Sequence, residues 1–229
     1  ALRGFLERET GTPELVLGVL RLVAVDGRLL AWAEPLAEEP PGPVRAALAS
    51  GFRRSSSSPL NRQKTLAYLE NSLLGREARR QGVYELLACN EHGRLTDGSR
   101  TTLLVNLDRG WMTPPVEEGA LPGTLRALLV EAGLVREVPL DLKDLRRARA
   151  AVLANALREL VPVGELAGLE GAQGLDPEPA ALRDLRVARE AGDLARVAFI
   201  AHSIKGVSAS LFADELDVDA LRTEAAARA

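Results

Sequence analysis

The chain has 229 residues, of which 46% are apolar and 27% charged, and its formal net charge is −3. This composition can bury a sizeable core and leaves room for more than one domain, while it offers no overall basic excess for gripping a phosphate backbone. We therefore expect a globular, cytoplasmic protein that binds neither nucleic acid nor membrane, since no apolar run approaches the roughly 20 residues needed to cross a bilayer.

Cysteine and arginine usage narrows the possible chemistry further. The single cysteine, Cys89, excludes an intramolecular disulfide and a thiolate-based metal cage, and we expect it to pack in the core. Arg146, Arg147 and Arg149 form a local basic cluster, which we interpret as a solvated helix face.

The first predicted element is a β-hairpin. Apolar stretches at Leu15–Val25 and Leu29–Trp32 are joined by Asp26-Gly27, which is the strongest short-range hairpin signal. The two stretches therefore predict an antiparallel strand pair near the start of the chain.

A loop-rich segment is predicted between the hairpin and Lys64. Pro40–Pro43 and Ser55–Pro59 are rich in turn-forming residues, so regular structure is not expected to persist there. Lys64 is one of only three lysines in the chain. Its amine can form a Schiff base with an aldehyde, which arginine cannot do, although a lone lysine is more often a solvated surface group.

Helices and strands alternate after Lys64. Apolar residues at helical spacing, closed by Gly82, predict a helix that covers a sheet, namely Leu66, Leu69, Leu73, Leu74 and Ala78. Short apolar or β-branched runs predict strands at Tyr84–Ala88, Thr101–Leu107 and Ala150–Leu153, and helices are predicted at Thr124–Ala132 and Leu142–Arg149. This mixture indicates an α+β or α/β fold.

The composition changes beyond Val163. Residues Gly164–Pro179 are rich in Gly, Glu and Pro, as linkers are, and the remainder is rich in alanine and leucine at helical spacing. We place a boundary near Gly171. The expected domains are residues 1–170, with an α+β fold, and residues 171–229, a small all-α segment.

Four motifs follow Lys64 in order. They are Gly93–Val105, Thr113–Pro115, Gly119–Arg126, and Asn155–Leu157 together with Val161–Val163. In this order and spacing the set resembles the class IV aminotransferase family, the fold-type IV pyridoxal-phosphate enzymes, over roughly residues 2–168. The resemblance implies the α/β-type large domain of that family, pyridoxal 5′-phosphate as cofactor, and no need for a metal.

The resemblance also implies roles for single residues. Lys64 would be the catalytic residue, holding the cofactor aldehyde as a Schiff base and later transferring protons. Asp97 stands where the family usually has glutamate, and its carboxylate would keep the pyridine nitrogen protonated. Tyr68 matches a tyrosine near the cofactor. From the residues alone, Asp97-Gly98 can also be a plain turn.

The cofactor phosphate is expected at Gly123, Thr124 and Leu125. This loop-to-helix junction offers backbone N–H groups and the positive end of a helix dipole. Many relatives carry threonine where this chain has Leu125, so a hydroxyl contact must come from Thr124 or be absent. By the same resemblance, Asn155 lies in a later loop of the cofactor site. Thr102 replaces an asparagine that is common in the family.

Three reactions compete within the family: branched-chain transamination, D-amino-acid transamination, and the lyase step that makes 4-aminobenzoate from 4-amino-4-deoxychorismate. The spacing from Lys64 to Tyr68 and the sequence Asn155–Leu157 resemble the lyase group. Relatives also carry a smaller N-terminal domain and are typically homodimers. Because the chain begins at alanine and Met112 is its only methionine, we expect a fragment. The resemblance implies that the smaller domain supplies an arginine to the cofactor phosphate and one wall of the substrate pocket, so we expect that the fragment does not turn over substrate by itself.

A second resemblance concerns the end of the chain. Ala201–Gly206 contains His202 and Lys205 in a His-x-x-Lys-Gly pattern and resembles part of a histidine phosphotransfer module. His202 would accept a phosphoryl group from a receiver domain, with the lysine on the same helix face. The alternatives are an ordinary amphipathic helix, or a phosphorelay protein with a degenerate enzyme domain.

Overall fold

The computed structural model describes residues 18–25, 28–35, 40, 42–66, 68–172 and 174–177. The described residues before and after position 40 belong to two separate compact units. The first contains a hairpin of β1 (Gly18–Val25) and β2 (Arg28–Pro35), which pair in antiparallel fashion with Val25 opposite Arg28. The predicted hairpin is therefore confirmed.

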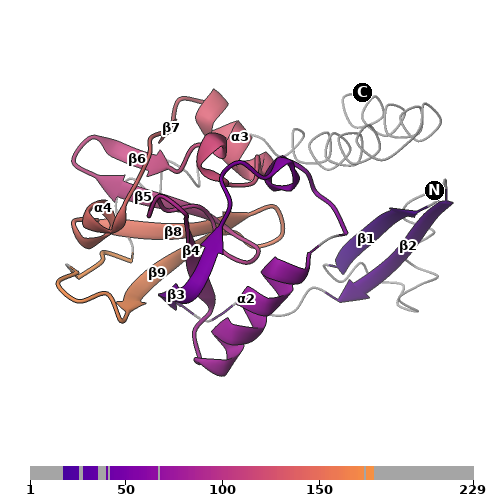
Figure 1. Ribbon diagram of the computed structural model, residues 1–229, viewed down its shortest axis with the longest axis horizontal. Helices are drawn as coiled ribbons and strands as arrows, with labels where there is room; N and C mark the ends of the chain where they lie inside the picture. Colours follow the sequence, from indigo (N-terminus) through magenta and orange to yellow (C-terminus); the bar gives the residue numbers. More distant parts are fainter. Residues whose placement is uncertain are drawn as a thin grey trace. The chain divides into compact units, whose positions relative to one another are not determined.

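The larger unit is built on a seven-stranded mixed sheet (Figure 1). In chain order its strands are β3 (Val44–Arg54), β4 (Glu85–Asn90), β5 (Thr102–Leu107), β6 (Gly110–Thr113), β7 (Val135–Glu137), β8 (Ala150–Asn155) and β9 (Glu159–Ala167). Their order across the sheet is β4-β3-β9-β8-β5-β6-β7. β3 runs parallel to both of its neighbours, β6 runs parallel to β7, and the other pairs are antiparallel.

Three α-helices and two short 3-10 turns connect the described strands of this unit. They are α2 (Leu69–Arg80), α3 (Thr124–Glu131), α4 (Leu142–Arg146), η1 (Pro59–Arg62) and η2 (Val116–Glu118). The mixture of strands and helices confirms the α+β fold class. Within the described residues, no helix is long and apolar enough to span a membrane. The predicted all-α segment and the predicted domain boundary near Gly171 stay predictions, because residues 178–229 lie outside the described part.

Alternation along the strands divides the core between the two faces of the sheet. In β5, Leu103 packs in one cluster with Leu145 of α4, whereas the adjacent Leu104 packs in another with Leu129 of α3. A third cluster holds Leu74 of α2 against β3 and β4. Helices α2 and α3 therefore cover separate patches of apolar strand side chains.

Strand β3 corrects the prediction of a loop-rich approach to Lys64. An eleven-residue strand, whose pairing with β4 shifts register between Leu48 and Arg53, lies between the prolines and the serines. Alanines at positions 46, 47 and 49 have little strand propensity, so the sequence signal is weak. The strand forms because it is hydrogen-bonded to β4 on one side and β9 on the other, with Ala46 fully buried.

Two other predicted elements differ from the structure. β9 extends to Ala167, inside the stretch with linker composition, because Leu166 and the following Leu169 are buried in the core. The helix predicted to reach Arg149 ends at Arg146, since Ala148 is fully buried and leads directly into β8. Apolar side chains thus override the linker-like composition at this end of the sheet.

Helix α2 agrees with the prediction in position but not in every contact. It ends two residues before Gly82, whose φ of +67° suits the predicted helix stop. Leu74 and Ala78 are buried as expected, whereas three of the predicted core leucines are exposed, namely Leu66, Leu69 and Leu73. The apolar stripe on this helix is therefore wider than the face that contacts the sheet.

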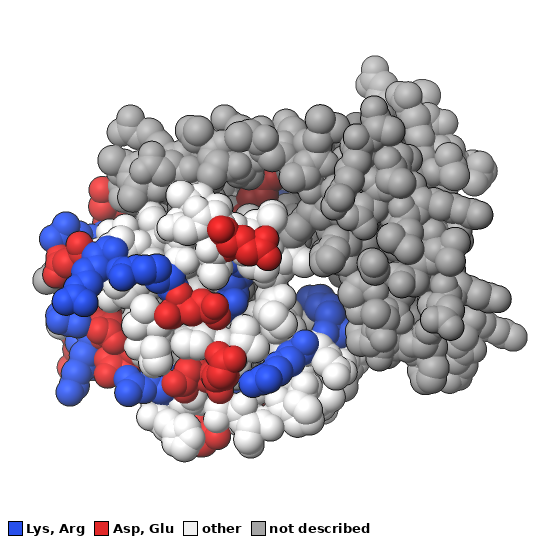
Figure 2. Space-filling view, turned by 90° about the horizontal axis from the view of Figure 1, so that it is seen from above, with Lys and Arg blue, Asp and Glu red and all other residues white. Residues whose placement is uncertain are grey.

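Charged side chains of both signs are interspersed on the face shown in Figure 2. Arg147 pairs with Asp144 at 2.8 Å and Arg149 with Asp108 at 2.6 Å, and both arginine side chains are largely exposed. The basic cluster is thus solvated, although only part of it belongs to a helix. Cys89 is buried in the core as predicted, and burial raises the pKa of its thiol.

Leu153→Ala should lower the free energy of unfolding by about 2–5 kcal/mol, because it empties a fully buried position in the middle of β8. Leu157→Ala, in the turn after the same strand and 47% exposed, is the matched control and should change stability by less than about 0.5 kcal/mol. Urea unfolding measures both. Equal effects would show that the sheet is not packed as described.

Candidate active site

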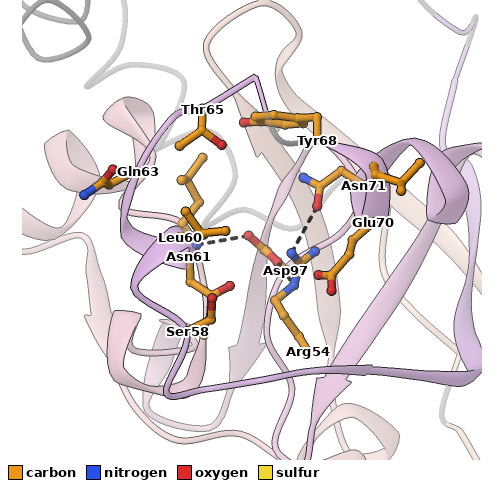
Figure 3. A pocket seen from close by; sticks show the side chains of 13 residues that line it. Arg54, Ser58, Leu60, Asn61, Gln63, Thr65, Tyr68, Glu70, Asn71 and Asp97 are labelled. Carbon is orange, nitrogen blue, oxygen red and sulfur yellow. Dashed lines mark hydrogen bonds and ion pairs between the residues drawn. The ribbon is translucent and has the colours of Figure 1, made fainter. Parts of the chain in front are cut away.

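A cavity of about 180 Å³ lies where β3 ends and α2 begins (Figure 3). Its lining comes from three parts of the chain: positions between 54 and 71, Asp97 after β4, and the segment from Gly119 to Leu121 before α3. Of the thirteen lining residues, eight carry charged, amide or aliphatic hydroxyl side chains and three are leucines. The cavity wall therefore combines polar and apolar surface in about equal parts.

Asp97 and Arg54 form a buried ion pair in the cavity wall. Their side chains are 9% and 7% exposed, and Arg54 Nε lies 3.0 Å from Asp97 Oδ1. The backbone N–H of Leu121 donates to Asp97 Oδ2 at 3.0 Å. Burial raises the pKa of the Asp97 carboxyl, and the Arg54 charge and the Leu121 amide act in the opposite direction.

One oxygen of Asp97 keeps hydrogen-bonding capacity. Although Arg54 Nε and Asp97 Oδ1 are close, they do not meet in hydrogen-bond geometry, and both atoms are buried without a hydrogen-bond partner. Since this oxygen has only the ion-pair contact with Arg54, its lone pairs can still accept a hydrogen bond from a ligand. A protonated ring nitrogen can donate such a hydrogen bond.

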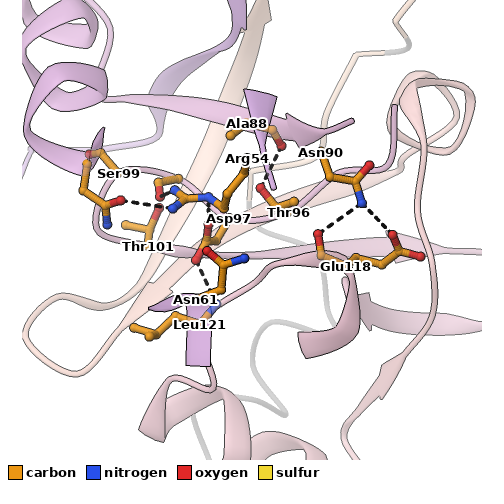
Figure 4. A network of polar contacts seen from close by, with 12 residues as sticks. Arg54, Asn61, Ala88, Asn90, Thr96, Asp97, Ser99, Thr101, Glu118 and Leu121 are labelled. Atoms are coloured by element: carbon orange, nitrogen blue, oxygen red, sulfur yellow. Dashed lines mark hydrogen bonds and ion pairs between the residues drawn. The ribbon is translucent and has the colours of Figure 1, made fainter. Parts of the chain in front are cut away.

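Arg54 links three elements around the cavity. Its guanidinium donates to Asn71 Oδ1 in α2 at 3.1 Å and to the carbonyl oxygen of Gly98 at 3.2 Å, besides pairing with Asp97 (Figures 3 and 4). Sequence reasoning missed this residue. It stands in the run Arg53-Arg54-Ser55, which reads as a solvated loop, and only the burial of β3 shows otherwise.

Further contacts hold the surroundings of Asp97. Gly75 lets α2 approach closely, since a Cβ there would lie 3.3 Å from Ser99 Oγ. Asn90, at the end of β4, donates through Nδ2 to the carbonyl oxygen and a carboxylate oxygen of Glu118 (Figure 4). That second contact fixes η2, directly before Gly119 of the cavity lining.

The structure places Lys64 at the edge of this site. Its side chain is exposed, and its Nζ lies 4.8 Å from the centroid of the Tyr68 ring. Tyr68, Gln63 and Thr65 line the cavity, whereas Lys64 itself does not. The structure therefore brings Tyr68 and Asp97 together in one cavity and leaves the Lys64 amine beside the Tyr68 ring.

The predicted phosphate segment lies next to the cavity lining. Helix α3 begins at Thr124 with Gly123 as its N-cap and no side-chain cap, so its first turn presents backbone N–H groups. The Leu125 side chain packs against the core, which leaves only its backbone N–H for a ligand. None of these three residues lines the cavity, but Leu121, two residues earlier, does.

Asn155 has a structural role in the turn between β8 and β9. Its Oδ1 accepts the backbone N–H groups of Leu157 and Arg158 at 2.9 and 2.7 Å, and its Nδ2 donates to the Arg100 carbonyl at 3.3 Å. Asn155 is not in the cavity lining. His202 lies outside the described residues.

Comparison with known proteins assigns the fold to a family. Residues 23–166 match the model of amino-transferase class IV. The chain belongs to the class IV aminotransferase family. It is 32% identical over 112 residues to the branched-chain-amino-acid aminotransferase of Escherichia coli strain K12, an alignment that covers 47% of this chain and 36% of that protein. The matched segment thus spans little more than a third of that curated relative.

Solved structures with the class IV fold include two that differ in described activity. A putative 4-amino-4-deoxychorismate lyase from Legionella pneumophila has a TM-score of 0.65 at 24% identity, covering 72% of this chain and 61% of that chain. A putative amino-acid aminotransferase from Mesorhizobium loti has a TM-score of 0.64 at 28% identity, covering 71% and 79%. Both neighbours therefore share the fold, and their names point to different reactions.

Arg54→Ala should lower the free energy of unfolding by about 3–5 kcal/mol at neutral pH, because it leaves the buried Asp97 carboxylate without its cation. The substitution raises the folded-state pKa of Asp97 further above its unfolded value. Stability is then lost as the pH rises through that folded-state pKa, so the defect shrinks in acid, where Asp97 is protonated. Urea unfolding across acidic to neutral pH measures this dependence.

Arg45→Ala is the matched control for Arg54→Ala, on the same strand. Arg45 pairs with Glu165 at 2.8 Å, and both side chains are 54% exposed. Its loss should cost less than about 1 kcal/mol and show no such pH dependence. A pH-independent defect in Arg54→Ala would contradict the buried ion pair.

Proposed function

We propose that this chain binds pyridoxal 5′-phosphate in the cavity between β3 and α2. The observation that carries the proposal is Asp97, a buried carboxylate in the cavity wall with one oxygen free of any hydrogen bond. That oxygen fits a protonated pyridine nitrogen. The first turn of α3 fits the phosphate, because the N–H groups of Thr124 and Leu125 lie three and four residues beyond Leu121 of the lining. The residues present therefore suit this cofactor.

Three residues of this chain would have separate roles in binding the cofactor and in catalysis. Asp97 holds the proton on the ring nitrogen, and Arg54 keeps the Asp97 carboxylate in place. Lys64 would hold the cofactor aldehyde and move protons, after its flexible stem turns from the Tyr68 ring into the cavity. The bound cofactor supplies an electron sink for the substrate carbon beside the amine.

The reaction that we propose is the conversion of 4-amino-4-deoxychorismate to 4-aminobenzoate and pyruvate. The bond between the ring carbon and the ether oxygen breaks, and the ring loses one proton as it becomes aromatic. Lys64 Nζ accepts that proton and returns it to the departing enolpyruvate, which becomes pyruvate. Atoms balance without an oxidant or a metal.

Two sequence features support this substrate. The Lys64-to-Tyr68 spacing and the sequence Asn155–Leu157 both resemble the lyase group. The fold itself does not separate the two reactions, because the putative lyase and the putative aminotransferase both share it. A second candidate, branched-chain transamination, is favoured by the 32% identity to the Escherichia coli enzyme. The predicted phosphorelay role of His202 stays a prediction.

Borohydride treatment of the chain with pyridoxal 5′-phosphate should attach the cofactor to Lys64 alone. Lys64→Ala should abolish the adduct, because the amine beside the cavity is then missing. Lys143→Ala, which removes an exposed lysine in helix α4, is the control and should leave the labelling unchanged. Mass spectrometry of the peptides measures both. Equal labelling of Lys64 and Lys143 would contradict a specific site.

Substrate preference can be measured without turnover, because an amine substrate that binds the cofactor displaces Lys64 and so reduces the amount of trapped Lys64 adduct. At equal concentration, 4-amino-4-deoxychorismate should reduce the borohydride-trapped Lys64 adduct more than L-leucine does, because the Lys64-to-Tyr68 spacing resembles the lyase group. D-alanine serves as a third amine. Stronger release by L-leucine would favour the transaminase instead.

A further inference from the structure

Glu85 is a second buried carboxylate, behind the cavity wall. It is the first residue of β4 and is fully buried. Its Oε1 accepts the backbone N–H groups of Ser99 and Leu86 at 2.9 and 3.1 Å. Its Oε2 accepts the Thr101 hydroxyl at 2.9 Å and the Arg100 N–H at 3.3 Å. Three of the four donors therefore come from the three residues that follow Asp97-Gly98.

Gly98 lies directly against the Glu85 carboxyl group. A Cβ on Gly98 would lie 2.5 Å from Glu85 Cδ, so the backbone fits there only because glycine has no side chain. The Gly98 N–H donates to the Thr101 carbonyl at 2.8 Å, and the Gly98 carbonyl accepts from Arg54 at 3.2 Å. The segment from Asp97 to Thr101 is thus held between a carboxylate and a guanidinium.

The burial of Glu85 makes it costly to move the segment from Ser99 to Thr101 away from the carboxylate. In the described part of the chain, no Lys, Arg or His nitrogen forms an ion pair with Glu85. A buried charge without a cation depends on its hydrogen bonds, and moving the segment away would remove three of its four donors. An apolar side chain at position 85 would instead leave the Ser99 and Arg100 N–H groups without an acceptor.

We propose that Glu85 is a positioning residue for the cofactor site. Glu85 does not line the cavity and acts through the segment from Ser99 to Thr101, which fixes the direction of the Asp97 carboxylate. This inference rests on the proposed cofactor for its functional meaning. The positioning itself can be measured without cofactor, because the Leu121 N–H donates to Asp97 and does not contact Glu85.

The test compares Glu85→Gln with Glu165→Gln, an exposed glutamate on β9 of the same sheet. Glutamine keeps one acceptor oxygen and presents an NH₂ group to donors. In the cofactor-free chain, amide hydrogen exchange at Ser99 and Leu121 should accelerate by about tenfold, the effect of losing a hydrogen bond to a charged group. Exchange at Leu153, in the core of β8, reports global opening and serves as the internal reference.

Cofactor binding is the second measurement. The dissociation constant for pyridoxal 5′-phosphate, followed by absorbance, should rise by about tenfold in Glu85→Gln and stay unchanged in Glu165→Gln. Unchanged exchange at Leu121 relative to Leu153 would overturn the positioning role. Faster exchange with unchanged affinity would overturn its importance for the cofactor. If the parent chain does not bind the cofactor, the proposed function fails, and exchange at Leu121 still decides the role of Glu85.

A milder variant covers the case in which Glu85→Gln does not fold. Thr101→Val removes one donor to Glu85 Oε2 and keeps the carboxylate and the side-chain shape. It should accelerate exchange at Ser99 and Leu121 in the same direction by a smaller factor. No acceleration in a folded Thr101→Val chain would contradict a carboxylate that holds the segment.

Discussion

The buried pair of Arg54 and Asp97 is the constraint on which the rest of the site depends. Two opposite charges are removed from water together, which is stable only when the surrounding groups supply further hydrogen bonds. Arg54 obtains them from Asn71 in α2 and from the Gly98 carbonyl, and Asp97 from the Leu121 N–H. The end of β3, the start of α2 and the segment before α3 are therefore tied to one charge pair.

The sequence predicts those elements that are marked by residues adjacent in the chain, and it misses those that form through contacts between distant residues. The hairpin at Asp26-Gly27 is a short-range signal, and α3 after Gly123 is marked by a loop-to-helix junction; both were predicted and are present. The Arg54 guanidinium donates to the Gly98 carbonyl, 44 positions away in the sequence. The residues adjacent to Arg54 in the sequence do not predict that it is buried. β3 is similarly defined by pairing with two distant strands rather than by its alanines.

For Lys64 the sequence predicts the chemistry of the residue but not where its side chain lies. Its chemistry could be anticipated from residue type and motif spacing, but its placement depends on packing around η1 and α2. The aromatic face of Tyr68 attracts the lysine cation and keeps Nζ at the cavity edge, while Gln63 and Thr65 face the cavity. Because Lys64 and its described neighbours Gln63, Thr65 and Leu66 lie in neither helix nor strand, the flexible lysine stem can reach either place.

The two buried carboxylates of this region show why residue type alone does not identify a site. Glu85 has both oxygens occupied by four donors from its own chain, and it lies away from the cavity. Asp97 lies in the cavity wall, with one oxygen outside hydrogen-bond geometry. The first carboxylate can therefore only hold structure, whereas the second can still accept a donor from a ligand. Hydrogen-bond satisfaction, rather than charge or burial, separates the supporting residue from the binding one.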